Sequence, residues 1–359
     1  VRSQFQYDSL NRLTLATDSL GGTVKYQYDP LGNVVSETDP LGGMKSFSYN
    51  ANGILMGVYY SNGDEVRYEY NPTGLMIAAH RPSGGITRFE YDEMGNLASE
   101  KDPLGNESRY AYDLAGRVLA FTDGEGGVTR FHYDAVGKLI RKRLPDDKEI
   151  RYRYDESGRL LEADDATYPL FYTYDSAGRL TRAEYPIVKK TVTYEYDKNG
   201  RRRQLVLPDG QAIHYEHDEL GQLAAIVVPN REKISFTYDR KGRQETVAYP
   251  NGITGSWEYN TEGRITRIKY EDKKGKVLSS VSYLLDKAGN IIERRDESGE
   301  VVLYKYDETG QLLEESSLDA TTNYRYGPGG NRIEVQKGKD VEKYRHDAGD
   351  RLVAAGGEK

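Results

Sequence analysis

The stretch YDESGRLLEADD at 154–165 decides the fold, because the chain repeats it again and again. YDAVGKLIRKRL begins 21 residues earlier, and YDLAGRVLAFTD begins 21 residues before that. With the first Tyr of each copy as position zero, 17 copies run from Tyr7 to His346, most of them 21 residues apart. A fixed period of about 20–50 residues indicates a repeat array rather than an ordinary globule. We therefore expect one continuous array over residues 1–359, with one insert at about 269–280 that lengthens a hairpin loop.

The columns of the repeat predict its local structure. The residue two positions before position zero is aromatic in all 17 copies. A spacing of two residues puts both aromatic rings on the same face of a strand. At +1 the residue is usually Asp, which initiates turns, and at +4 it is Gly in 15 copies, which allows a positive φ. We take the following residues as the structural repeat signature and its paired aromatics: Tyr112, Asp113, Gly116, Arg117, Tyr133, Asp134, Gly137, Tyr154, Asp155, Gly158, Arg159, Tyr174, Asp175, Gly178 and Arg179, with Tyr110, Phe131, Tyr152 and Tyr172.

Two turns per repeat predict an all-β fold. D-x-x-G closes one end of each strand pair, and a second turn such as DPLGG at 39–43 or DPLGN at 102–106 closes the other. We predict a tandem array of about 17 antiparallel β-hairpins of about 21 residues. One coil of a parallel β-helix has a similar period, but we favour hairpins because D-x-x-G reverses the chain directly after a strand.

The predicted sheet is too wide to stay flat. About 34 strands at about 4.8 Å spacing would span about 160 Å, and open sheets beyond about ten strands curl. Aliphatic material for a second layer is scarce, since apolar residues make up 37% of the chain even with its 31 tyrosines counted. We therefore expect a curved, spiralling, shell-like wall, with aromatic rings stacked in ladders along the sheet and with open sheet edges that allow self-association.

Composition excludes several functional classes. The chain has no Cys, so disulfides, Cys-ligated zinc and thiol catalysis are excluded. The net charge of −7 is spread over interspersed signs and provides no field for nucleic acid. No stretch approaches the roughly 18 apolar residues of a membrane span. The chain begins inside a repeat and without Met, so we expect a fragment of a longer polypeptide.

No motif predicts catalysis, a metal or a cofactor. The acidic pairs at 146–147 and 164–165 match turn chemistry in a chain with 57 acidic residues. His214 and His217 lie three apart on a predicted strand, hence on opposite faces, and no third metal ligand is evident. In the basic run 201–203, Arg202 replaces the usual aliphatic residue, which favours a solvated strand face or stacking on neighbouring tyrosines. The remaining histidines are His80, His132 and His346.

The sequence resembles the YD-repeat, or Rhs-repeat, family over its whole length. The resemblance is carried by Y-D-x-x-G-R-L at 112–118 (with Val at its end), 154–160 and 174–180, and by D-P-L-G at 39–42 and 102–105. Relatives include bacterial Rhs and polymorphic toxins, Tc-type toxin shell subunits and teneurins. The resemblance implies a non-enzymatic, spiralling β-sheet shell that is secreted or delivered and whose partner is a C-terminal toxic cargo domain of the same parent chain. Family toxins release that cargo with aspartates near a D-P-x-G motif; Asp39 and Asp102 occupy ordinary repeat turns, so we do not carry that role over.

Two other functions compete with the shell. Tyr-rich faces are also suited to binding carbohydrate or a cell-surface partner, which would make the chain an extracellular binding module. An enzyme is the weaker alternative, because no catalytic constellation stands out. The recurrence of tyrosines in every repeat favours a structural role, since a ligand site needs its rings in one place only.

Overall fold

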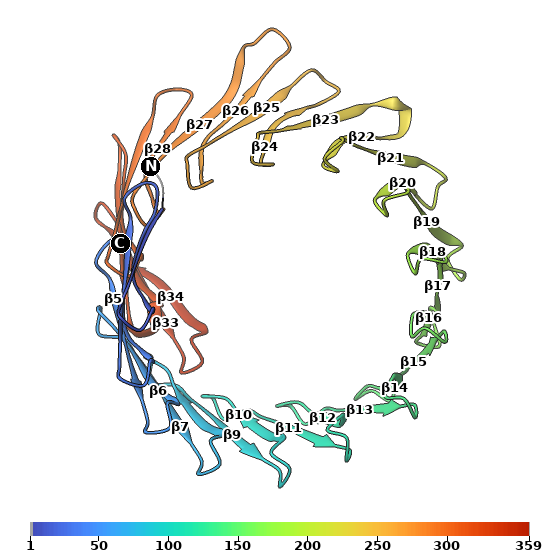
Figure 1. Cartoon of the computed structure of the whole chain (residues 1–359), viewed down its shortest axis with the longest axis horizontal. Helices are drawn as coiled ribbons and strands as arrows, with labels where there is room; N and C mark the ends of the chain where they lie inside the picture. The colour runs from blue at the N-terminus through green and yellow to red at the C-terminus, as the bar shows by residue number, and fades with distance from the viewer. Residues whose placement is uncertain (1–2, 359) are drawn as a thin grey trace. The chain divides into compact units, whose positions relative to one another are not determined.

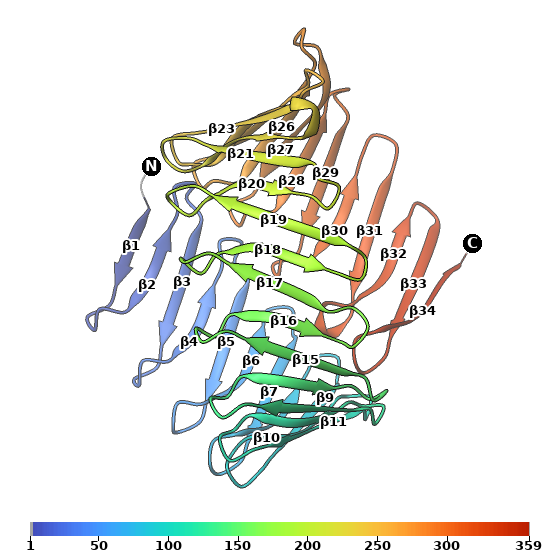
Figure 2. The same cartoon turned by 90° about the vertical axis from the view of Figure 1, so that its right-hand side faces the viewer.

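The computed structural model describes residues 3–358, which form one sheet of 34 strands (Figures 1 and 2). The described residues contain no α-helix, only the short 3-10 turns η1 (Pro229–Arg231) and η2 (Pro328–Gly330). Strands pair with their chain neighbours and run antiparallel. The predicted all-β hairpin array is confirmed, and the parallel β-helix alternative is wrong.

The chain divides into two compact units, each built of such hairpins. The first unit comprises residues 1–107, 256–271 and 275–359, and the second comprises 108–255 and 272–274. The first unit holds β1 (Gln4–Tyr7), β2 (Leu13–Thr17), β3 (Thr23–Tyr28), β4 (Val34–Thr38), β5 (Met44–Tyr49), β6 (Leu55–Tyr60), β7 (Glu65–Tyr70), β8 (Met76–His80), β9 (Ile86–Tyr91), β10 (Leu97–Lys101), β26 (Ile265–Glu271), β27 (Val277–Leu285), β28 (Ile291–Asp296), β29 (Val301–Tyr306), β30 (Leu312–Ser316), β31 (Thr321–Tyr326), β32 (Arg332–Lys337), β33 (Asp340–His346) and β34 (Leu352–Glu358). The second unit holds β12 (Val118–Thr122), β13 (Val128–Tyr133), β14 (Leu139–Arg143), β15 (Glu149–Tyr154), β16 (Leu160–Asp164), β17 (Leu170–Tyr174), β18 (Leu180–Tyr185), β19 (Lys190–Tyr196), β20 (Arg202–Val206), β21 (Ala212–His217), β22 (Leu223–Val227), β23 (Lys233–Tyr238) and β24 (Gln244–Ala248). Two strands contain a unit boundary, β11 (Glu107–Tyr112) and β25 (Thr254–Tyr259).

Every repeat turns through the five residues that follow position zero, which we call the YD turn. In the repeat of Tyr154, the Asp155 amide donates to the Arg159 carbonyl at 2.9 Å, and the Gly158 amide donates to the Asp155 carbonyl at 3.0 Å. Gly158 has a φ of 85°, the positive value predicted for the +4 column. Tyr154 pairs with Leu160 across a β-bulge, so the turn also fixes the register of the strand pair.

The opposite end of each hairpin pair closes through a second turn, which we call the far turn. In the far turn 39–43, the Asp39 amide donates to the Gly43 carbonyl and the Gly42 amide donates back to the Asp39 carbonyl, at 2.9 and 3.1 Å. Gly42 has a φ of 96°. The far turn therefore repeats the hydrogen bonding of the YD turn, as the D-x-L-G pattern predicts.

Within residues 3–358 the sheet has no second layer that could form an ordinary core. The buried apolar residues are few and mostly small: Val58, Ala78, Ala225, Val247 and Val302. The accessible surface is 22752 Å², whereas a compact monomer of this mass exposes about 14,600 Å². Along a strand such as β15 the arginines are exposed and the alternating tyrosines are half-buried, so one face is charged and the other aromatic.

In the first unit, two distant blocks of hairpins meet edge to edge. The far turns between β2 and β11, at 18–22, 39–43, 60–64, 81–85 and 102–106, contact the YD turns that follow β25, β27, β29, β31 and β33; we call this contact the seam. Its hydrogen bonds join residues that are 242–269 positions apart in the sequence. Figure 1 draws the first block in blue to cyan and the second in orange to red.

The seam combines polar contacts with close backbone approach. The Ser19 amide donates to Glu262 Oε1 at 3.0 Å, and the Gly329 amide donates to Asp64 Oδ2 at 3.1 Å. The Arg81 guanidinium lies 3.4 Å from Asp350 Oδ2. A two-residue or 21-residue periodicity contains no information on which turns meet at such separations.

The predicted insert has a different structure from the one expected. It lengthens β26 and β27, which pair from Arg267 with Ser282 to Glu271 with Val277, instead of enlarging the loop. The connection 272–276 keeps the usual five residues, and Gly275 has a φ of 79°. The extra residues alternate and pair as strands do, so the ladder of backbone hydrogen bonds extends outward.

Candidate functional site

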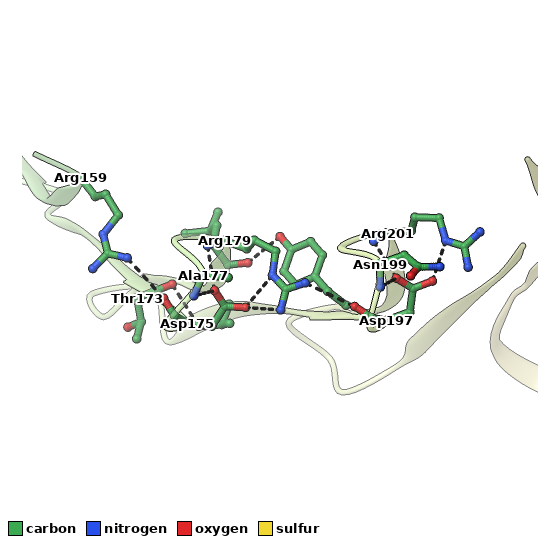
Figure 3. A network of polar contacts seen from close by, with 11 residues as sticks. Arg159, Thr173, Asp175, Ala177, Arg179, Asp197, Asn199 and Arg201 are labelled. Carbon is green, nitrogen blue, oxygen red and sulfur yellow. Dashed lines mark hydrogen bonds and ion pairs between the residues drawn. The ribbon is translucent and has the colours of Figure 1, made fainter. Parts of the chain in front are cut away.

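The most distinctive chemistry of the chain is a polar network that recurs at the YD turns (Figure 3). Asp175 Oδ1 accepts hydrogen bonds from the amides of Ala177 and Arg179, at 3.0 and 2.9 Å. Its Oδ2 accepts from Arg179 Nε at 2.7 Å. Asp is needed here because a short carboxylate reaches both amides while leaving a second oxygen for the +5 side chain.

The arginine five residues after position zero (+5) contacts both its own turn and the next repeat. Arg179 Nη1 donates to the carbonyl of Asp197 at 3.3 Å, and its guanidinium lies 4.9 Å from the centre of the Tyr196 ring. Arg159 binds the next repeat in the same way, with the Asp175 carbonyl at 3.3 Å and the Tyr174 ring at 5.2 Å (Figure 3). The guanidinium thus joins two repeats by a hydrogen bond and by a cation–π contact.

The tyrosine at position zero binds back to the preceding repeat. Tyr196 Oη donates to the Leu180 carbonyl at 2.7 Å, and Tyr174 Oη donates to the Leu160 carbonyl at 2.8 Å. The same bond is made by Tyr28, Tyr49, Tyr91, Tyr133, Tyr154, Tyr238, Tyr306 and Tyr326. We call this Asp–Arg–Tyr arrangement the inter-repeat ladder.

Burial and hydrogen bonding shift the pKa values along the ladder. The amide of Arg117 and, next to it, the Arg117 guanidinium lower the pKa of Asp113 despite partial burial. The same groups of Arg159 lower the pKa of Asp155. Burial raises the pKa of Tyr154. The aspartates are therefore held charged and the tyrosine neutral, which are the forms that the ladder needs.

The structure brings the predicted signature residues together across repeats. Arg117 lies over the ring of Tyr133, 5.0 Å from its centre. Lys138 takes the place of Arg in the next repeat, lying 5.6 Å from the Tyr154 centre and 3.4 Å from the Asp155 carbonyl. The glycines of this stretch all have positive φ: Gly116, Gly137, Gly158 and Gly178. Asp134 accepts the amides of Val136 and Lys138, as its counterparts do.

The paired aromatics are less regular than the ladder. Tyr110 contacts Phe121 at 5.2 Å between ring centres, and Phe131 lies 6.0 Å from Lys142 Nζ. Tyr152 and Tyr172 stand half-buried on the aromatic face, and burial raises the pKa of Tyr172. Continuous stacking of ring on ring remains a prediction.

The structure confirms that Arg202 stacks on neighbouring tyrosines, which is one of the two interpretations of this residue. Its guanidinium lies between Tyr194 and Tyr215, at 5.0 and 5.9 Å from their ring centres. Arg332 lies between Tyr324 and Tyr344 in the same way, at 6.0 and 5.1 Å. Arg202 and Arg332 both stand six residues after position zero, so cations at +6, like the arginines at +5, lie against the rings of neighbouring repeats. The repeat pattern alone did not predict this pairing.

The other candidate residues are acidic side chains that stabilise turns. Asp146 pairs with Lys148 at 2.6 Å, and Asp165 accepts the amides of Thr167 and Tyr168. The oxygens of Asp39 and Asp102 cap their own far turns through residues two and four positions later. Asp164 caps its turn through the Ala166 amide.

The histidines are separated from one another. His80 Nε2 lies 2.6 Å from Glu69 Oε1, and His214 is exposed on β21 whereas His217 is half-buried. His132 and His346 are likewise half-buried strand residues. Within residues 3–358, no group of three His, Asp or Glu side chains has the arrangement of a metal site. No helix in this part of the chain is long and apolar enough to cross a membrane.

Two cavities lie along the seam. The larger, about 700 Å³, is lined by groups of both charges, including Asp64, Arg67, Asp307 and Arg325, and by Tyr326. The smaller, about 470 Å³, lies between the far turns near 39–64 and the YD turns near 308–330. Their mixed charges match the polar contacts of the seam.

Comparison with known proteins agrees with the hairpin architecture. A family model described as Teneurin YD-shell matches residues 42–167 and 162–347, and one described as RHS repeat matches residues 4–44. No curated protein matches the sequence.

Solved structures share the fold at low sequence identity. The Tc holotoxin pore of Photorhabdus luminescens superposes with a TM-score of 0.83 and 16% identity, over 98% of this chain and 22% of that one. The crystal structure of TcdB2-TccC3 superposes with a TM-score of 0.67 and 16% identity, over 98% of this chain and 25% of that one. The chain thus spans about a quarter of the length of these structures.

Proposed function

The chain belongs to the Teneurin YD-shell family, and from this premise we propose that it is a segment of a shell wall that encloses a cargo polypeptide. Its contribution is exclusion rather than chemistry, because a wall separates what lies behind it from proteases and solvent. The residues that we propose carry this role are those of the inter-repeat ladder and the glycines of the turns.

The seam is the observation that carries the proposal. A single-layer sheet becomes a barrier only if its turn edges are closed against other parts of the sheet. At the seam, far turns of early repeats lie against YD turns of late repeats, close enough for the Ser19 amide to bond Glu262 and the Gly329 amide to bond Asp64. Contacts of this kind join the turn edges of the two blocks.

The ladder supports the proposal because it stiffens a sheet that has almost no core. Each position-zero tyrosine that bonds a carbonyl of the preceding repeat contributes about 0.5–1.5 kcal/mol. Repetition along the array makes the sum large without a second layer, as in other repeat proteins whose stability is a sum over neighbours. The hydroxyls of these tyrosines are used in the ladder, which argues against a Tyr-rich carbohydrate-binding face built from them.

The proposal also covers the cargo and the location of the shell. The superposed structures are named as a Tc holotoxin pore and as TcdB2-TccC3, and the proposed cargo of this chain is a toxic domain of its own parent chain. The proposed location is accordingly extracellular, after secretion or delivery. We propose no catalytic residue, metal or cofactor for the segment itself.

A disulfide across the seam tests the wall. The chain has no Cys, and the Cβ position of Gly349 lies 3.3 Å from Leu104 Cδ1. Leu104→Cys with Gly349→Cys should therefore form an intrachain disulfide in the monomer, whereas either single variant should not. Failure of the double variant to close under oxidising conditions would contradict the seam.

Limited proteolysis of the parent chain tests the enclosure. The segment that follows the array should resist protease in the wild type and become cleavable when the seam is opened by Gly43→Val. A segment that is cut equally fast in both proteins would rule out encapsulation while leaving the disulfide result unaffected.

A further inference from the structure

The inter-repeat ladder matches a carboxylate with a partner inside each YD turn. In all 13 repeats with Asp at +1, the +5 residue is Arg, Lys, Asn or Gln. Asp175 Oδ2, for example, accepts from Arg179 Nε at 2.7 Å. Two of the three repeats with Asn at +1 have an aliphatic residue at +5 instead; the pairs are Asn50 with Ile54 and Asn71 with Leu75. In these repeats the carboxylate and its polar partner are lost together.

Arg264 breaks this match. It stands at +5 of the repeat whose +1 residue is Asn260, and the next position zero is Leu285 instead of a tyrosine. Asn260 Oδ1 already accepts the amides of Glu262 and Arg264, both at 3.0 Å. The other group of its side chain, Nδ2, donates and cannot accept from a guanidinium. Arg264 is therefore a ladder cation whose carboxylate and ring are both replaced in the sequence.

The guanidinium of Arg264 is partly withdrawn from water. The side chain is half-buried, and its Cζ lies 2.6 Å from the Cβ position of Gly289, so it packs on the backbone of the next YD turn. Within residues 3–358, no acceptor is within hydrogen-bond reach of its buried Nη1 atom. A charged group that leaves water without a partner costs free energy, and a bound anion recovers it.

The two carboxylates of the adjoining turns have other partners. Glu262 Oε1 accepts the Ser19 amide across the seam at 3.0 Å. Asp286 Oδ1 accepts the amides of Gly289 and Asn290 at 2.7 and 2.9 Å, and its Oδ2 accepts Asn290 Nδ2 at 3.0 Å. Their hydrogen bonds form without Arg264, which leaves its charge to an external ligand.

We propose that Arg264 binds a small oxyanion, which takes the part that the +1 aspartate has in the other arginine-containing turns. A planar guanidinium pairs with two oxygens of a phosphate or carboxylate group at once. Because the side chain is only half-buried, it stays within reach of solutes. Inorganic phosphate and acetate represent the two sources of this chemistry.

The site lies between two turns that hold the far turn 18–22. Arg264 ends the YD turn that binds Ser19 through Glu262. Its guanidinium packs on the YD turn of Lys287, whose carbonyl oxygen is 2.9 Å from the Cβ position of Gly22. An anion at Arg264 should therefore stiffen the seam at this far turn. That consequence, unlike the site itself, rests on the wall proposed above.

Thermal melting in increasing inorganic phosphate, with potassium chloride added to keep the ionic strength constant, tests the site. The wild-type melting temperature should rise with phosphate, as for any ligand that binds the folded chain. Arg264→Leu, which recreates the pairing of Asn71 with Leu75, should weaken the apparent affinity at least about tenfold. Asn260→Asp, which supplies the missing carboxylate, should weaken it similarly while raising the melting temperature in chloride alone.

The matched control is Arg159→Leu, because Arg159 Nε already donates to Asp155 Oδ2 at 2.6 Å. This variant should melt earlier than the wild type and keep the full response to phosphate. A parallel series in acetate identifies the preferred ligand, which is the anion that raises the melting temperature at the lower concentration.

Equal responses of the wild type and Arg264→Leu would show only the general effect of salts on folded proteins and would overturn the inference. A wild type that responds to neither anion, or an Asn260→Asp that responds like the wild type, would overturn it as well. Phosphate should also slow amide exchange at 18–22 in the wild type but not in Arg264→Leu, and unchanged exchange there would overturn the link to the seam. These results leave the wall itself untouched, since the disulfide between residues 104 and 349 is tested without phosphate.

Discussion

Replacing Gly43 by Ala perturbs the seam at its closest backbone contact. The new Cβ would lie 2.0 Å from the Glu308 carbonyl oxygen and 3.1 Å from its carbonyl carbon, whereas carbon atoms in favourable contact are about 3.5–4.0 Å apart. The YD turn after β29 would therefore have to move away by more than 1 Å. Overpacking of this kind costs about 1–3 kcal/mol.

The matched control is the neighbouring Gly42→Ala. Gly42 has a φ of 96° and no atom within 4 Å of its Cβ position, so this variant introduces backbone strain of about 1–2 kcal/mol without a clash. Both variants should melt earlier, by about 2–4 °C per kcal/mol for a cooperative unit of about 200 residues. The melting temperature alone therefore does not separate them.

Hydrogen exchange separates the two variants. Gly43→Ala should speed amide exchange in residues 307–311, which lie more than 260 positions away in the sequence, because the far turn no longer fits against them. Gly42→Ala should leave exchange there at the wild-type rate. Equal exchange at 307–311 in Gly43→Ala and the wild type would refute the close approach at the seam.

Three further predictions concern the repeat itself. Gly158→Val should destabilise its hairpin by about 1–3 kcal/mol, because a β-branched residue is strained at a φ of 85°; an unchanged melting temperature would contradict the turn. Tyr154→Phe should lower the free energy of unfolding, measured by chemical denaturation, by about 0.5–1.5 kcal/mol because it removes the hydrogen bond to the Leu139 carbonyl. An unchanged free energy of unfolding would contradict the role of this tyrosine in the ladder. The pKa values of Asp113, Asp155 and Asp175 are lowered in the folded chain, so their charged forms stabilise the fold at a pH above the unfolded pKa of about 4. The urea midpoint of unfolding should therefore fall as the pH drops below about 4 through the folded pKa values. A urea midpoint that stays constant down to about pH 2 would contradict the charged ladder.

The hairpins were predictable because their determinants are local. Asp at +1 and Gly at +4 specify a turn within five residues, and Gly158 shows the positive φ that its column implied. The alternation of aromatic and charged residues specifies the two faces of a strand such as β15. Such features need no knowledge of where other repeats lie.

The ladder could be predicted only in part, since it joins neighbouring repeats. The +5 column contains Arg179, Lys138 and Asn33, and these side chains share the role of binding their own turn or the next one. Sequence alone does not reveal that the Arg of one copy lies on the Tyr of the following copy. That pairing depends on the stagger of adjacent hairpins, which the bulge at position zero sets.

The seam could not be predicted from the 21-residue period. Its contacts join residues such as Arg81 and Asp350, and which copies meet depends on how far the sheet bends per repeat. Small changes of twist in each strand pair would shift the partner by whole repeats. Gly22, Gly43 and Gly85, each the second of two glycines in a far turn, were the signal available in the sequence, because the turn alone did not need them.

Small-angle scattering of the monomeric chain tests most directly whether it forms a wall or a filled globule. A compact globule of this length has a radius of gyration of about 21 Å. The account predicts a clearly larger value, together with a pair-distance distribution weighted toward long distances, as a thin wall gives. A radius at or below about 21 Å with the profile of a solid sphere would contradict the wall and the enclosure proposed from it.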